Sequence, residues 1–151
     1  MELLLLAPLL LMIYSDFRYR NILLWHILLF GVIQIAVCIY KYGIVFTGWN
    51  AAINTVILLI IGIVVGTYSA FRFKGKKKPI GMGDILFILF LTPFFDYHTF
   101  LYFLITSFIV TLVGWAIWHY LLKKTSEDIP LVSGVGICYT LLLIHQFMVS
   151  L

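Results

Sequence analysis

Hydrophobic positions dominate six long stretches of the chain, which are separated by short polar segments. The apolar stretches cover residues 3–17, 22–40, 50–71, 84–95, 99–122 and 129–149. Inside a bilayer every backbone polar group needs a partner within its own segment, so stretches that are apolar on all faces predict helices. About 20 residues form one spanning helix, and the chain therefore has room for about six spans and little else.

Composition supports this prediction and excludes several classes of protein. Of the 151 residues, 64% are hydrophobic and 11% are charged, whereas soluble domains are roughly half apolar and a quarter charged. Water-soluble enzymes, disordered chains and nucleic-acid-binding modules are therefore excluded, and the net charge of +4 comes from short basic clusters between the apolar stretches. We expect an all-α integral membrane protein with six transmembrane helices in a single domain over residues 1–151. Its surroundings are the lipid bilayer, with no nucleic-acid partner.

The basic residues predict how the chain is oriented. Nine of the ten Lys and Arg residues lie in the segments that follow the first, third and fifth stretches, namely Arg18, Arg20, Arg72, Lys74, Lys76, Lys77, Lys78, Lys123 and Lys124. The other one is Lys41. Cytoplasmic segments of membrane proteins carry the excess of Lys and Arg. We therefore expect these three segments in the cytoplasm, both termini on the outer side, and a multi-pass protein of the cell's inner (cytoplasmic) membrane.

Two acidic residues stand at the ends of the two shortest stretches. Twelve apolar residues in a helix cover only about 18 Å of a hydrocarbon core that is about 30 Å thick. The first and fourth helices therefore reach a full span only if they carry Asp16 and Asp84 into the membrane boundary. An acid there is costly and is a functional residue by default. Two structural roles remain open: a salt bridge of Asp16 with Arg18 or Arg20, and an N-cap role for Asp84.

The predicted topology brings both acids to the same depth on the cytoplasmic side. Two carboxyl groups in one water-accessible pocket do not easily ionise together, and a pair that holds one proton is the working state of an aspartic protease. We therefore predict Asp16 and Asp84 as catalytic residues that need no metal or cofactor. Gly81, Met82 and Gly83 precede Asp84, and the two glycines leave bare backbone where an extended peptide can approach.

The segment Gly81-Met82-Gly83-Asp84, taken with SDFRYRNI at residues 15–22, resembles the GxGD-type aspartyl proteases, in particular the type IV prepilin peptidases. The resemblance implies a six-helix core in which Asp16 and Asp84 cleave the basic leader from pilin-like precursors at the cytoplasmic membrane face. It is closest to short forms without an N-terminal methyltransferase region, so we expect no N-methylation. The chain departs from the family pattern at Leu23 and Leu24, where Pro-Asn is usual, and at Ser133, where a second Pro is common.

Two other functions are compatible with the same features. Acids inside a membrane also occur in ion- or proton-coupled transporters, and a small transporter is one alternative. Both acids lie at one edge of the predicted bundle, however, whereas transporter sites lie near mid-membrane. A catalytically inactive scaffold for pilus assembly is the other alternative.

Packing between the helices is predicted from small and polar residues. Gly62 and Gly66 form a GxxxG pair, which allows a second helix to approach closely. We expect Gln34, Asn50 and Asn54 to form hydrogen bonds between helices.

Overall fold

Six α-helices and one short 3-10 turn form the computed structural model, which describes residues 2–19, 23–73, 81–122 and 131–149. The described residues contain no β-strand, so the predicted all-helical class is confirmed. The elements are η1 (Glu2–Leu5), α1 (Leu6–Tyr19), α2 (Leu24–Tyr42), α3 (Ile44–Phe73), α4 (Met82–Leu91), α5 (Tyr97–Leu122) and α6 (Leu131–Val149).

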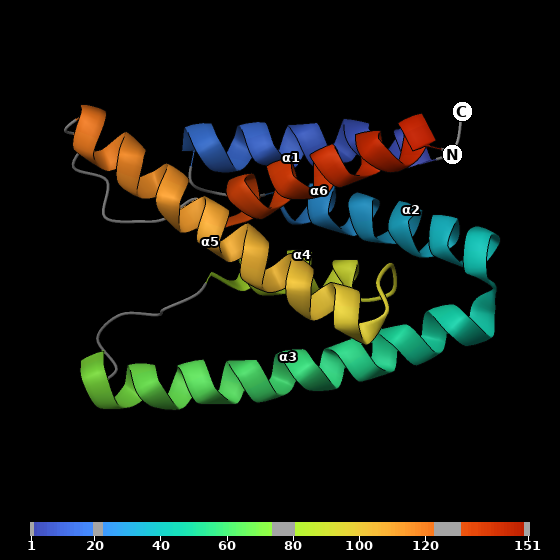
Figure 1. Ribbon diagram of the computed structural model, residues 1–151, viewed down its shortest axis with the longest axis horizontal. Coiled ribbons are helices and arrows are strands. Elements are labelled where there is room, and N and C mark those ends of the chain that lie inside the picture. Colours follow the sequence, from blue (N-terminus) through green and yellow to red (C-terminus); the bar gives the residue numbers. More distant parts are fainter. Residues whose placement is uncertain (1, 20–22, 74–80, 123–130, 150–151) are drawn as a thin grey trace.

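Successive helices run in opposite directions, α5 lies obliquely across the others, and both ends of the chain lie at the same end of the bundle (Figure 1). The opposite end of the bundle is formed where α1 ends and where α4 and α6 begin (Figure 1). We call this the α1–α4–α6 end. Helix α6 packs against α1 and α5, and α2 packs against α4.

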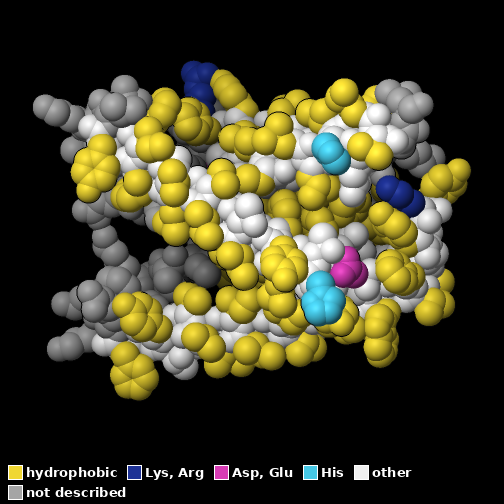
Figure 2. Space-filling view, in the orientation of Figure 1, with side chains coloured by type: hydrophobic (Ala, Val, Ile, Leu, Met, Phe, Trp, Pro, Cys, Tyr) yellow, Lys and Arg dark blue, Asp and Glu magenta, His cyan; other side chains and the backbone are white. Residues whose placement is uncertain are grey.

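Four helices are long and apolar enough to cross a membrane: α2, α3 over Ile44–Tyr68, α5 over Tyr97–Trp118, and α6. Apolar side chains cover most of the face in Figure 2. The chain is therefore a membrane protein. Helices α1 and α4 are shorter, with 14 and 10 residues, and α4 alone spans only about 15 Å. Most of the basic residues that predict orientation, Arg20, Lys74, Lys76, Lys77, Lys78, Lys123 and Lys124, lie outside the described residues.

Most helix boundaries lie within about three residues of the sequence prediction, and two differ by more. Helix α3 begins at Ile44 rather than at residue 50, because a single residue, Gly43, reverses the chain with a φ of 83°. Glycine adopts this conformation at no steric cost. Helix α4 ends at Leu91 rather than at residue 95, and a buried turn follows it. The Nδ2 of Asn54 donates to the carbonyl oxygens of Thr92 (2.9 Å) and Phe95 (2.7 Å), so α3 supplies the hydrogen bonds that this turn lacks.

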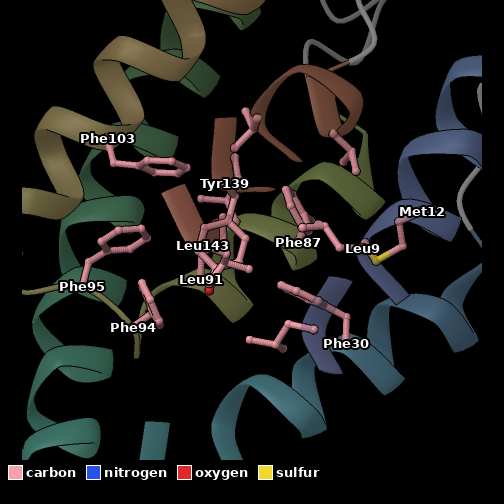
Figure 3. Close-up of a cluster of buried hydrophobic side chains, with 14 of the residues drawn as sticks. Leu9, Met12, Phe30, Phe87, Leu91, Phe94, Phe95, Phe103, Tyr139 and Leu143 are labelled. Atoms are coloured by element: carbon pink, nitrogen blue, oxygen red, sulfur yellow. The ribbon is translucent and has the colours of Figure 1, made fainter. Parts of the chain in front are cut away.

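The core is centred on the fully buried Tyr139 of α6. Its ring makes edge-on contacts with the rings of Phe30 and Phe94, and Phe95 and Phe103 stack on each other beside it (Figure 3). The Nε2 of Gln34 lies 2.7 Å from the Tyr139 hydroxyl, which confirms the expected hydrogen bond between helices at Gln34. This core holds α2, α4, α5 and α6 together beside the helix ends that carry the acids.

Close helix contacts occur at glycines other than the GxxxG pair. Nothing lies within 4 Å of a Cβ placed on Gly62 or Gly66, so no described helix packs closely against this pair. A Cβ on Gly31 would instead lie 2.5 Å from the ring of Phe90, and one on Gly136 would lie 2.9 Å from Ile13. These glycines bring α2 against α4 and α6 against α1, because a larger residue would collide with the facing side chain.

Candidate active site

Asp16 and Asp84 both belong to the α1–α4–α6 end of the bundle. Asp16 lies in the last turn of α1, and Asp84 lies in the first turn of α4. Ser133 lies beside them in the first turn of α6. Helices α3 and α5 continue past this end (Figure 1). The two acids therefore stand where three helix termini meet between two longer helices.

Asp16 is buried, with 7% of its surface exposed. Its Oδ2 atom accepts two hydrogen bonds from Ser133, one from the backbone N–H at 2.8 Å and one from the side-chain hydroxyl at 2.7 Å. The guanidinium of Arg18, on the exposed side of α1, donates to the hydroxyl of Tyr14. Arg20 lies outside the described residues. The described contacts of the carboxylate thus join α1 to α6, rather than closing a salt bridge within the loop.

Asp84 is half-buried and is the third residue of α4. Its Oδ2 accepts a hydrogen bond from the backbone N–H of Gly81 at 3.1 Å. The N-cap position itself belongs to Gly81, and Asp84 caps the helix from its third position, so the expected capping role is present but is exerted from N3. A Cβ on Gly81 would lie 3.0 Å from this Oδ2, so the glycine makes room for the carboxylate. Of the other predicted site residues, Met82 is exposed and Gly83 is half-buried.

Asp16 and Asp84 lie on α1 and α4, which are far apart in sequence, and the fold alone brings both acids to the α1–α4–α6 end. Two carboxyl groups that lie close together do not easily ionise at the same time, and such a pair holds one proton. Within the described ranges, no group of three or more His, Cys, Asp or Glu residues could hold a metal ion.

Ser133 is the residue of this site that the sequence prediction missed. It was noted as a departure from the family pattern but was given no role. The available signal was a hydroxyl at the start of the last apolar stretch, at the same end of the bundle as both acids. Another buried polar atom belongs to the first turn of α2. It is Nδ1 of His26, which has no hydrogen-bond partner among the described residues.

No family model, curated protein sequence or solved structure matches the chain. A function for the protein is therefore argued from its own residues and their geometry.

Proposed function

We propose that the chain is a membrane aspartic endopeptidase that removes the basic leader from type IV pilin-like precursors. In this proposal it is a six-span protein of the cytoplasmic membrane with both termini outside, and Asp16 and Asp84 are its catalytic pair. The proposal includes the two short helices α1 and α4 as spans, because they carry the acids to the cytoplasmic boundary.

One observation carries the proposal: two carboxyl groups from distant parts of the sequence lie at the same end of an apolar bundle. An isolated acid at such a position is costly, and a second like charge beside it adds repulsion. Structural roles account for only part of this arrangement, because a helix cap at Asp84 does not require Asp16 nearby. A shared proton turns the same repulsion into a working acid and base.

Hydrolysis by such a pair needs no further group. The ionised carboxylate takes a proton from water while the water oxygen bonds to the carbonyl carbon of the substrate, and the carbonyl oxygen takes the proton of the second carboxyl. The resulting diol then collapses. Its carbon–nitrogen bond breaks, the leaving nitrogen takes the proton from the first carboxyl, and one diol hydroxyl returns a proton to the second. The pair ends in its starting state.

The substrate class follows from the position of the pair and from the Gly81–Gly83 segment. A peptide must be extended at the bond to be cut, and bare backbone beside Asp84 leaves space for it. A site at the membrane boundary suits a precursor whose apolar helix stays in the bilayer while its leader stays in water. The resemblance of the GMGD segment to prepilin peptidases selects pilin-like precursors within that class.

The test is cleavage of a synthetic precursor by the purified full chain in lipid nanodiscs. The precursor has a basic leader that ends in Gly, followed by an apolar helix of about 20 residues. We expect mass spectrometry to detect a product shortened by the leader. Asp16→Asn and Asp84→Asn should each lower the rate by at least about 100-fold. Asp96→Asn is the matched control at the opposite end of the bundle and should cleave normally.

Three results would contradict the proposal. Cleavage that persists at full rate in either Asn variant removes that acid from the catalytic pair. Proton flux across liposomes without any cleavage would identify the acids as a transport site. The absence of both cleavage and flux would favour the scaffold alternative.

A further inference from the structure

Ser133 makes the surroundings of the two acids unequal. Its backbone N–H and its hydroxyl both donate to the same atom, Asp16 Oδ2, at 2.8 and 2.7 Å. The N–H groups in the first turn of a helix have no acceptor within that helix, so Asp16 accepts a bond that α6 cannot form internally. Ser133 is itself 3% exposed, and water does not compete for these bonds. Two donors on one oxygen stabilise the ionised form of a carboxyl group.

Asp84 has weaker support for a negative charge. Its Oδ2 receives one hydrogen bond, from Gly81 at 3.1 Å, and that donor belongs to the start of its own helix. When one proton is shared between two such groups, it resides on the group whose charged form is less stabilised.

We propose that Ser133 is a positioning residue that holds Asp16 as the ionised member of the pair and leaves the shared proton on Asp84. The catalytic consequence rests on the proposed function, whereas the location of the proton does not. In the hydrolysis described above, Asp16 is then the base that takes the proton from water. Asp84 is the acid that protonates the carbonyl oxygen, and both groups return to these states when the leaving nitrogen departs.

Among the described residues, no other titratable group is hydrogen-bonded to either carboxyl group. The titratable groups described on α1, α2, α3, α5 and α6 are Tyr14, Arg18, His26, Cys38, Tyr40, Lys41, Tyr42, Tyr68, Tyr97, His98, Tyr102, Tyr120, Cys138, Tyr139 and His145. Arg18 donates to Tyr14 on the exposed face of α1, and Tyr139 bonds to Gln34 in the core.

Carbon-13 NMR of protein labelled at the Asp carboxyl groups tests where the proton resides. The chain has only four Asp residues, Asp16, Asp84, Asp96 and Asp128, and the signals of the pair are assigned by their loss in Asp16→Asn and Asp84→Asn. At neutral pH we expect the Asp16 signal at a carboxylate position and the Asp84 signal at a carboxylic-acid position. The opposite order, or two carboxylate signals, would overturn the proposal.

Variants of Ser133 separate positioning from a general role in stability. Ser133→Ala removes the hydroxyl donor, and the two signals should move toward each other as the proton is shared more evenly. Ser133→Thr keeps both donors and should restore the wild-type positions. Ser107→Ala is the matched control, because Ser107 is equally buried and its hydroxyl bonds only to the backbone of its own helix among the contacts described. Signals that do not respond to Ser133→Ala would overturn the proposal.

Cleavage kinetics supply the second readout. Ser133→Ala should lower kcat about tenfold with little change in KM, since one charge-assisted hydrogen bond is lost from the base. Ser133→Thr should recover most of the rate. An equal loss of kcat in Ser133→Thr would overturn the positioning role. If the wild-type chain cleaves no precursor, the proposed function fails, while the NMR signals still decide where the proton lies.

Discussion

Helices α6 and α3 are both long and apolar enough to cross a membrane, yet they have different places in the bundle. Within the span, 33% of α6 is buried but only 6% of α3, although α3 has the higher mean hydropathy (2.2 against 1.7). Helix α6 meets α1, α4 and α5, whereas α3 is attached to the rest by α2 and α5. Apolar content therefore determines that a helix can enter a membrane, while facing side chains determine how tightly it packs.

The surroundings of the glycine residues differ between α6 and α3. Gly134 of α6 faces Thr111 of α5, and Gly136 faces Ile13 of α1, whereas Gly62 and Gly66 of α3 face nothing within 4 Å. Lipid tails are as apolar as Leu, so helices associate in membranes through close packing rather than through apolar surface alone. The tightly packed helices carry the two acids to one end of the bundle, and the buried residues of α3 lie in its first half.

The largest expected effect is that of Gly134→Ala. The new Cβ would lie 2.5 Å from Cγ2 of Thr111, and Thr111 cannot easily rotate because its hydroxyl donates to the Ser107 carbonyl at 2.6 Å. We expect the free energy of unfolding to fall by about 1–3 kcal/mol in SDS titrations. Gly62→Ala is the matched control and should change stability by less than about 0.5 kcal/mol. Equal effects of the two substitutions would remove the distinction between α6 and α3.

Much of the fold follows from local features of the sequence. The apolar stretches locate the helices, because continuous apolar character requires internally bonded backbone in a membrane. The start of α3 was predicted six residues late because residues 44–49 contain Thr47 and Gly48, which look like a loop. In the structure the Thr47 hydroxyl bonds back to the Gly43 carbonyl at 2.8 Å, so it fits within the helix. The GxxxG pair allows a close approach, but the motif contains no information about what lies opposite it, and no described helix lies there.

The contacts of the candidate site also differ in how far the sequence alone could predict them. The contact between Gly81 and Asp84 joins residues three positions apart, and the sequence pattern alone indicated both. The contact between Asp16 and Ser133 joins residues 117 positions apart. It depends on how α1 and α6 are rotated about their own axes. Helix α6 is apolar around most of its circumference, so its sequence does not indicate which face meets α1.

A second prediction concerns the attachment of α3. Asn54→Ala removes both hydrogen bonds to the buried carbonyl groups of Thr92 and Phe95. We expect the free energy of unfolding to fall by about 1–2 kcal/mol, since these acceptors are left without a donor. Asn50→Ala is the control one turn earlier: its Nδ2 is buried and has no partner among the described residues. A larger loss from Asn50→Ala than from Asn54→Ala would contradict this account of the turn.

The hydrogen bond in the core should contribute less. Tyr139→Phe keeps the ring contacts and removes only the hydroxyl that bonds to Gln34. Hydrogen bonds between membrane helices contribute about 0.6 kcal/mol on average, and we expect a loss of this size in unfolding titrations. Tyr102→Phe, at an exposed position on α5, should have no measurable effect. If the Tyr139 variant is as stable as the wild type, the hydrogen bond to Gln34 makes no measurable contribution to stability. The ring contacts of residue 139 then account for its role in the core.

The smallest effect is expected at the start of α5, where Asp96 caps the helix outside the membrane-spanning segments. Its Oδ2 accepts a bond from the Thr99 N–H at 3.4 Å. Hydrogen bonding from Thr99, chiefly through its side chain, lowers the pKa of the Asp96 carboxyl below its usual value of 3.8. A lowered pKa in the folded state means that ionised Asp96 stabilises the fold above about pH 4, and that this contribution disappears as the pH falls through the lowered value. Asp96→Asn keeps a neutral cap and removes the titration. Thermal unfolding from about pH 6 to pH 3 should therefore lower the Tm of the wild type more than that of the variant, by a small margin because the group is exposed. Parallel Tm curves for the two proteins would show that Asp96 does not couple folding to pH.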